Sequence, residues 1–171
     1  EKTGKLIAPR KQHGSQWGVC CPCETPEGHG VGVIKNMAVT ATVSIFSSPV
    51  TVYAYLQRLD RLVGLKEANI EELHSCTRVF LNGSWIGVLR PADAAWVVNQ
   101  LRSAKRAGKL HRYTGIVWKN AFKELWMTTE AGRILRPIYY AAAVREVMRD
   151  ASGVLREQLL AIQDWNHLLL W

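Results

Sequence analysis

TRVFLNGSWIGVL, residues 77–89, carries the strongest local structural signal in the chain. Residues 77–81 and 84–89 are rich in β-branched and aromatic side chains, which favours strands. Asn82 and Gly83 lie between them, and both residue types tolerate the positive φ angles that a two-residue type I′ turn requires. The stretch therefore predicts a β-hairpin.

Helices are predicted on both sides of this hairpin. Upstream, Ser48 is a suitable N-cap and Pro49 a suitable first residue for a helix over residues 49–63, with Gly64 beyond its end. Its expected apolar stripe consists of Val52, Leu56, Leu59 and Val63. Downstream, Arg90-Pro91 begins a second helix over residues 91–107, closed by Gly108, with Ala95, Val98 and Leu101 on its inner face.

Further strands are predicted over residues 112–118, 122–128 and 133–140, and a C-terminal helix is predicted from Ala141. The order of these elements does not alternate strictly between strand and helix. It favours an α+β fold with mixed strands and helices.

The first 36 residues have a different character, because closely spaced glycines and prolines exclude long helices and suit a backbone that bends near another molecule. A strand is predicted next, over residues 37–46. Residues 36–57 carry no charge over a length that would span a bilayer. Scattered Ser and Thr residues and Pro49 favour a strand followed by a helix, so we interpret the protein as soluble.

The charge balance favours a polyanionic partner. Lys and Arg number 22 against 14 Asp and Glu, a net charge of +8. No acid occurs between Asp93 and Glu124, where seven Lys and Arg fall. Two interpretations of this stretch stay open: a solvated helix face with its loop, or a surface that faces phosphates. The 48% hydrophobic content excludes wholesale disorder.

Cys20, Cys21 and Cys23 crowd together, far from Cys76, which is a poor pattern for disulfides and suggests reduced thiols. No second cysteine pair exists for a structural zinc, so we predict no zinc and interpret the cluster as small buried side chains in a tight turn. Most of the seven tryptophans are expected in the core, and only Trp17 is kept as a candidate base-stacking platform. Glu24 and Glu27 flank Thr25-Pro26, but nothing else in the chain supports hydrolysis.

The glycine- and proline-rich segment carries a more specific signal. His13-Gly-Ser-Gln-Trp-Gly18, then Cys21-Pro-Cys-Glu-Thr-Pro-Glu-Gly28, then Gly32-Val-Ile-Lys-Asn36 strongly resemble a succession found in the second-largest subunit of multisubunit DNA-directed RNA polymerases. The hairpin at residues 79–87 resembles the opening of that family's external region, and residues 128–137 resemble its close. Trp17 and Lys35-Asn36 resemble eukaryotic, archaeal or large-DNA-virus members more than bacterial ones. Val33, Thr129-Glu130 and the cysteine cluster depart from the family pattern.

The resemblance implies an internal fragment of a much longer subunit. Its fork-type Gly/Pro-rich segment would be followed by a small external α+β region. The implied divisions are a fork-region domain at residues 1–66, which lines the active centre, and an external region with a first part at 67–137 and a second, truncated part at 138–171.

The implied function is DNA-templated RNA synthesis as part of the nucleotidyltransferase, and the fragment alone is expected to be inactive. The resemblance implies that Mg²⁺ is held mainly by the largest subunit, so no catalytic or metal-binding residue is assigned here. Expected partners are template DNA, nascent RNA, nucleoside triphosphates, the largest subunit and smaller subunits, with no membrane. The expected location is the nucleus for a cellular eukaryote, or the cytoplasm or virion for a large DNA virus. The residues expected to line the active centre or contact nucleic acid are Arg10, His13, Gln16, Trp17, Glu24, Thr25, Pro26, Glu27, Gly28, Lys35 and Asn36.

Within this set, Arg10 and Lys35 are expected to neutralise phosphates, and Glu27 to organise neighbouring basic groups. An alternative hypothesis is a stand-alone basic nucleic-acid-binding module without catalysis. A metal-dependent redox protein built on the cysteine cluster is a third hypothesis.

Overall fold

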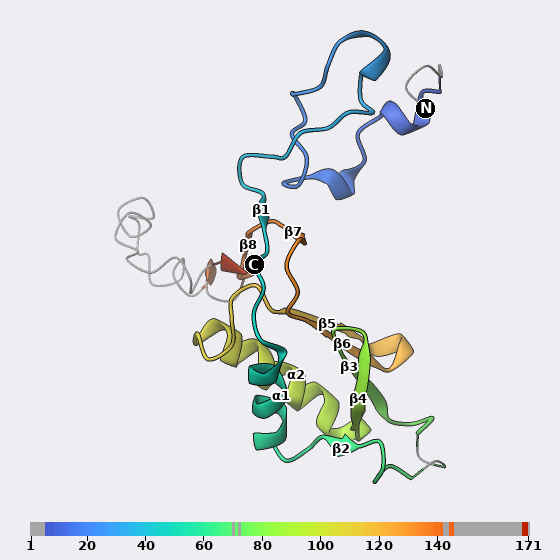
Figure 1. Cartoon of the computed structure of the whole chain (residues 1–171), viewed down its shortest axis with the longest axis vertical. Coiled ribbons are helices and arrows are strands. Elements are labelled where there is room, and N and C mark those ends of the chain that lie inside the picture. Colours follow the sequence, from blue (N-terminus) through green and yellow to red (C-terminus); the bar gives the residue numbers. More distant parts are fainter. Residues whose placement is uncertain (1–5, 70, 72, 142–143, 146–168, 171) are drawn as a thin grey trace. The chain divides into compact units, whose positions relative to one another are not determined.

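Figure 1 shows the computed structural model of the chain, which describes residues 6–69, 71, 73–141, 144–145 and 169–170. The chain divides into two compact units. Unit 1 comprises residues 1–43 and 133–171, and unit 2 comprises residues 44–132. The polypeptide therefore leaves unit 1, forms all of unit 2, and returns to unit 1. The domain boundaries predicted at 66/67 and 137/138 stay a prediction.

Within the described residues, unit 2 contains a five-stranded sheet in the order β2-β4-β3-β6-β5. Its strands are β2 (Val63–Gly64), β3 (Thr77–Leu81), β4 (Ser84–Leu89), β5 (Gly115–Lys119) and β6 (Glu124–Thr128). All neighbouring strands are antiparallel except β3 and β6, which run parallel with Val79 opposite Leu125. The predicted hairpin is confirmed, with positive φ at both Asn82 and Gly83.

The core of unit 2 lies between this sheet and two helices, α1 (Pro49–Arg58) and α2 (Pro91–Arg106), which Figure 1 shows together beside the sheet. Burying these aliphatic side chains is the main stabilising contribution. The buried residues of the core are Val52, Leu56, Val79, Leu81, Leu89, Ala94, Val97, Val98, Leu101, Ala104, Leu110, Leu125 and Met127. Helices and mixed sheets together confirm the α+β class.

The predicted start of α1 is confirmed, because the Ser48 hydroxyl accepts a hydrogen bond from the backbone N–H of Val50. Its predicted end is wrong, because the helix stops at Arg58 and Asp60 adopts a left-handed φ of 52°. Aspartate tolerates this conformation better than most residues, so it ends the helix before Gly64. Val63 consequently pairs with Val88 in the sheet instead of extending the helical stripe.

The second helix starts at Pro91 as predicted, and Gly108 follows it with a φ of 72°. The prediction that Ala95 faces inward is wrong, because Ala94 and Val97 are buried instead and Ala95 is exposed.

Two predicted strands are much shorter than expected. Of residues 37–46, only β1 (Thr42–Val43) is a strand, because residues 134–135 are its only described strand partner. The region over residues 133–140 is split into β7 (Ile134–Leu135) and β8 (Ile138–Tyr139) around Arg136-Pro137. Proline has no backbone N–H to donate to a ladder, which explains the interruption. Strand β8 pairs with β9 (Leu169–Leu170), and the helix predicted from Ala141 lies almost entirely outside the described residues.

Among the described residues, no helix combines the length and the apolar character needed to cross a membrane.

The hairpin turn is fastened to the end of β6 through Asn82. Its side-chain Nδ2 donates to the Thr129 hydroxyl at 2.9 Å, and its Oδ1 accepts from the Thr129 backbone N–H at 2.8 Å. Thr129 is fully buried, so losing these bonds leaves its polar groups without compensation.

We expect Asn82→Ala to destabilise unit 2 by about 2–3 kcal/mol, because it removes both bonds and places alanine at a positive φ. Asn82→Asp is the matched control. Aspartate keeps the side-chain acceptor and also tolerates a positive φ, so only the side-chain N–H donor is lost. Urea unfolding of the chain measures the difference. An Ala variant as stable as the Asp variant would contradict the role of the turn.

Candidate functional site

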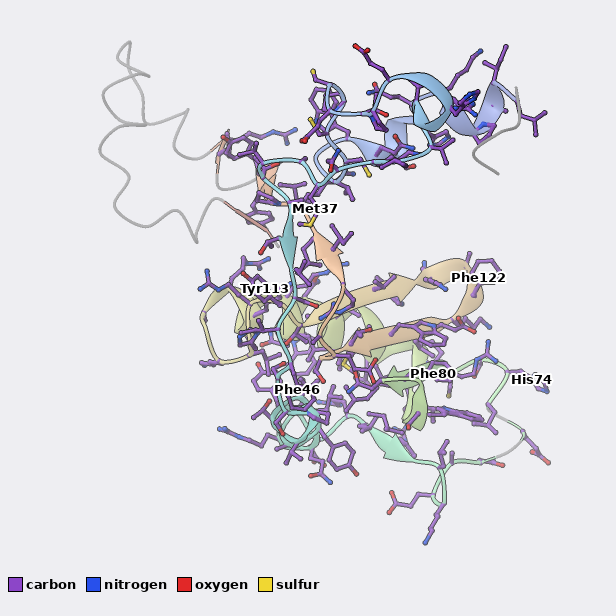
Figure 2. The ribbon with its side chains drawn as sticks, turned by 45° about the horizontal axis from the view of Figure 1, so that its top comes forward. Met37, Phe46, His74, Phe80, Tyr113 and Phe122 are labelled. Atoms are coloured by element: carbon purple, nitrogen blue, oxygen red, sulfur yellow. The ribbon has the colours of Figure 1, made fainter. Side chains whose placement is uncertain are left out.

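The segment from residue 6 to residue 43 contains the sequence-predicted site residues, and it is held together mostly by turns and side-chain bonds. It includes three one-turn 3-10 helices, at Ala8–Arg10, Gly14–Gln16 and Gly28–Gly30. Residues 21–36 form a loop whose two ends meet. At this neck, the Cys21 N–H donates to the Asn36 carbonyl at 2.9 Å, and Cys20 forms an antiparallel bridge with Met37 (labelled in Figure 2). We call residues 21–36 the neck-closed loop.

The Thr25 hydroxyl links the two sides of the neck-closed loop. It accepts from the Gly32 N–H at 2.8 Å and donates to the Ile34 carbonyl at 3.1 Å. The Asn36 side chain adds a second link, from Nδ2 to the Glu24 carbonyl at 3.3 Å. These bonds replace the ladder that a regular element would supply, and they explain how an irregular segment keeps a defined shape.

Arg10 holds the tip of the neck-closed loop. Its Nη1 donates to the carbonyls of His29 and Val31, at 2.8 and 2.9 Å. Gly32, with a φ of +70°, lies directly against the Arg10 backbone, where an added Cβ would approach the Arg10 carbonyl oxygen to 2.2 Å. The structure therefore gives Arg10 a fastening role that sequence reasoning missed. No sequence signal was available, because the partners are backbone carbonyls 19 and 21 residues away.

His13, Gln16 and Trp17 lie in a separate turn, which we call the Trp17 turn (residues 13–18). His13 Nδ1 accepts from the Ser15 N–H at 3.2 Å and lies 2.8 Å from the Ser15 hydroxyl oxygen. The Gln16 carbonyl accepts from the N–H groups of Val19 and Cys20, which closes the turn. Trp17 is 80% exposed, so its indole is accessible for contact with another molecule.

The segment exposes charges of both signs, since Lys11 and Lys35 are exposed as well as two carboxylates. Glu24 and Glu27 are exposed, and within the described part of the chain neither carboxylate makes a hydrogen bond or ion pair. Lys35, by contrast, donates from Nζ to the Gly32 carbonyl at 2.7 Å. The two cations expected to meet phosphates, Arg10 and Lys35, are thus both engaged in holding the loop. Pro26 and Gly28 are exposed beside Glu27.

The residues that the structure describes do not assemble a metal site, since no group of three or more His, Cys, Asp or Glu side chains is placed to hold an ion. All four cysteines are free thiols, and Cys21 Sγ accepts from the Glu24 N–H at 3.4 Å. The prediction that the cluster is buried is wrong. Cys23 is exposed, and Cys20 and Cys21 are only partly buried, because a tight loop of this size has no interior large enough to enclose them.

Unit 2 carries tryptophan side chains that sequence reasoning had assigned to the core. Phe80, labelled in Figure 2, stacks on Trp126 with ring centroids 4.4 Å apart, and the Lys119 ammonium lies 5.4 Å from the Trp126 ring centroid. Trp85 and Trp96 are 39% and 46% exposed, so the core assignment is wrong for both. Period-2 alternation places Phe80 and Trp126 on the face opposite the core, which explains the result for the sheet.

The basic stretch after Asp93 is partly engaged within unit 2. Lys105 Nζ donates to the Thr114 carbonyl at 2.8 Å, and the Arg112 guanidinium lies 5.5 Å from the Tyr113 ring centroid. Lys105 and Arg106 also lie in the last turn of α2, where cations are favoured by the helix dipole. These contacts support the interpretation as a solvated helix face with its loop.

Comparisons with known proteins match two parts of the chain to sequence models of one family. Residues 1–43 match "RNA polymerase Rpb2, domain 3", and residues 79–141 match "RNA polymerase Rpb2, domain 4". The first match covers both the neck-closed loop and the Trp17 turn. The second covers the hairpin from Val79 onward, α2, β5 to β8 and Arg136.

Individual relatives agree with these models. DNA-directed RNA polymerase II subunit 2 of Arabidopsis thaliana is 31% identical over 170 residues, which is 98% of this chain and 14% of the relative. DNA-directed RNA polymerase II subunit RPB2 of Schizosaccharomyces pombe is 38% identical over 138 residues, 81% of this chain and 11% of the relative. DNA-directed RNA polymerase subunit 2 of Acanthamoeba polyphaga mimivirus is 36% identical over 138 residues, 79% of this chain and 11% of the relative. The chain thus spans about one seventh or less of the length of these relatives.

Proposed function

Because the chain belongs to the family of the second-largest subunit of multisubunit RNA polymerases, we propose that it serves in DNA-templated RNA synthesis as part of such an enzyme. We further propose that residues 6–43 line the active centre beside the RNA–DNA hybrid. We also propose that residues 1–66 form the fork-region domain and that the external region comprises residues 67–137 and 138–171.

The observation that carries the proposal is the way the neck-closed loop and the Trp17 turn are built. Their cations and hydroxyl groups are used internally, by Arg10, Thr25 and Lys35, to hold backbone in place. What they present outward is an exposed indole at Trp17 and exposed carboxylates at Glu24 and Glu27. A loop whose backbone is held by such bonds suits the wall of a reaction chamber, where positions must hold within fractions of an ångström.

This arrangement changes the expected chemistry of the wall. Trp17 supplies an aromatic face on which a base or ribose can pack. Glu27 is free to pair with a basic group of a neighbouring subunit, which agrees with an organising role rather than one in holding metal. Arg10 and Lys35 act on nucleic acid through the backbone that they position, not by direct neutralisation of phosphate.

The proposed partners are template DNA, nascent RNA, nucleoside triphosphates, the largest subunit and smaller subunits. Mg²⁺ would supply charge stabilisation for nucleotidyl transfer. We place it mainly in the largest subunit, as the family resemblance implies. We propose a nuclear location for a cellular eukaryotic enzyme, and the cytoplasm or virion for a viral one.

A stand-alone nucleic-acid-binding module is the alternative proposal, and the family relationship disfavours it. The matched segments lie in the same order as two consecutive domains of one subunit, and the relatives are all subunits of a larger enzyme. A basic module would also be expected to present free Lys and Arg side chains in its glycine-rich loop. The neck-closed loop uses Lys35 internally instead.

The experiment that tests the proposal is site-specific photocrosslinking in the full-length subunit assembled with its polymerase. A photoreactive phenylalanine derivative replaces Trp17 in one enzyme and Val117 in the other, both positions being exposed and hydrophobic. In a stalled elongation complex with labelled RNA and template, we expect crosslinks to nucleic acid from position 17 and none from position 117. Crosslinks from position 17 to protein only would contradict the active-centre placement.

A further inference from the structure

Arg136 contacts the Trp17 turn, although 119 positions separate the two residues. Its Nη1 donates a hydrogen bond to the Trp17 carbonyl. Its aliphatic part lies along Gly18, where an added Cβ would meet Arg136 Cδ at 3.2 Å and Cβ at 3.5 Å. One side chain therefore makes a polar contact and a packing contact with two consecutive residues of the same turn.

Local structure explains why Arg136 reaches this position. Pairing of β7 with β1 places Leu135 opposite Thr42, so the chain returns beside the N-terminal segment immediately before Arg136. Pro137 follows and favours an extended backbone at Arg136. On the other side of the contact, Gly18 has a φ of +71° and no side chain, which leaves room for the arginine stem.

Besides the bond from the Ser15 N–H to His13 Nδ1, backbone hydrogen bonds hold the Trp17 turn together. The N–H groups of Gln16, Trp17, Val19 and Cys20 all donate to carbonyls of residues 13–16. The Trp17 carbonyl is the next acceptor along the chain, and Arg136 is the donor that meets it. A charged donor to a carbonyl is among the stronger hydrogen bonds available to such a turn.

We propose that Arg136 is a positioning residue that holds the Trp17 turn, and with it the exposed indole of Trp17, in the geometry used by the polymerase. The functional half of this statement rests on the proposed placement of residues 6–43 in the active centre. Arg136 lies in the segment matched to domain 4 and Trp17 in the segment matched to domain 3. We call the contact of Arg136 with Trp17 and Gly18 the clasp. Through it, the shape of one family domain depends on a residue of the next.

The test uses the full-length subunit in its assembled polymerase, with Arg136→Ala, Arg136→Lys and Arg112→Ala. Arg112→Ala is the charge-matched control, because Arg112 is an exposed arginine of unit 2 whose side chain lies over Tyr113. Hydrogen exchange is followed on the peptide that contains the amides of Trp17, Val19 and Cys20. Single-nucleotide addition is measured in parallel, with kcat and the nucleotide KM determined separately.

We expect Arg136→Ala to accelerate exchange of these amides about 3- to 10-fold, the range for loss of one exposed hydrogen bond with its packing. Arg136→Lys, which keeps the stem and one donor, should recover part of the protection, and Arg112→Ala should leave exchange unchanged. If the turn lies at the active centre, Arg136→Ala also raises the nucleotide KM or lowers kcat, and Arg136→Lys partly restores it.

The two proposals fail in different ways. Faster exchange with unchanged nucleotide addition supports the clasp and counts against the active-centre placement. Unchanged exchange in Arg136→Ala overturns the clasp, whatever the kinetics show.

A second variant tests the contact from the other side if Arg136→Ala prevents assembly. Gly18→Ala introduces a Cβ against the arginine stem, and we expect it to accelerate exchange of the same amides by at least a similar factor. Combined with Arg136→Lys, whose stem is equally long, the effects should be less than additive, because both changes disturb one contact. Full additivity would overturn the clasp.

Discussion

Gly32→Ala is expected to release the tip of the neck-closed loop from Arg10, with a local destabilisation of about 3 kcal/mol. The added Cβ would lie 2.2 Å from the Arg10 carbonyl oxygen and 2.8 Å from its Cα. Both neighbours are backbone atoms, which cannot turn away as the end of a flexible side chain can. The φ of +70° at this position adds the strain of a left-handed alanine.

Gly28→Ala is the matched control for this substitution. Gly28 has a similar φ of +78°, but nothing lies within 4 Å of an added Cβ, so only the left-handed strain of about 1 kcal/mol remains. Hydrogen exchange of the amides of Gly32 and Ile34 in the assembled enzyme measures the difference. We expect roughly 100-fold faster exchange in Gly32→Ala and about 5-fold in Gly28→Ala.

Equal exchange in the two alanine variants would show that the loop does not pack on the Arg10 backbone. Under the proposed function, Gly32→Ala also slows nucleotide addition more than Gly28→Ala does. If Gly32→Ala releases the loop but nucleotide addition keeps its normal rate, the described packing on Arg10 is supported. The proposed placement of the loop at the active centre is then contradicted.

Leu125→Ala is expected to destabilise unit 2 by about 3–4 kcal/mol. Leu125 is fully buried in β6, which lies between β3 and β5, and it belongs to the cluster shared with α1 and α2. Removing its branched end leaves a cavity that strands on both sides prevent from collapsing. The predicted loss is therefore near the upper part of the range for such substitutions.

Val117→Ala is the control on the neighbouring strand. Val117 is 52% exposed in β5, so its truncation is expected to change stability by less than about 1 kcal/mol. Urea unfolding of the chain, followed by tryptophan fluorescence, compares the two variants. Similar unfolding midpoints would contradict the assignment of Leu125 to a close-packed core.

Much of unit 2 could be predicted because its signals are local. Asn82-Gly83 specifies its turn through φ angles that few other residues adopt, and Pro91 and Gly108 mark the ends of α2. Burial followed from the same patterns, except at Ala95, where a helix face was misjudged by one position, and at Trp85 and Trp96, which are exposed. Residues three and four apart lie on nearly the same face of a helix, so the sequence pattern does not decide which of two neighbouring residues is buried. The sheet that packs against α2 decides it.

The site residues could be found from the sequence as a group, but their individual roles could not. His13, Trp17, Thr25 and Glu27 were recognised by a motif, which records identity and spacing. The bonds of Arg10, Lys35 and Arg136 run to backbone carbonyls, and a carbonyl is present at every residue, so no residue type marks the acceptor. Sequence reasoning therefore directed the side chains of Arg10 and Lys35 toward phosphate.

The amino-acid sequence by itself determined the hairpin, the starts of both helices, the α+β class and the family, because each depends on neighbouring residues or on an ordered motif. Tertiary structure alone decided that β1 is two residues long, that Asp60 ends α1, and that Arg10 and Arg136 fasten two turns from a distance. The physical reason is that strand pairs and these arginine contacts need backbone groups from a segment far along the chain. Only the folded path of the chain determines which segment lies close enough to supply them.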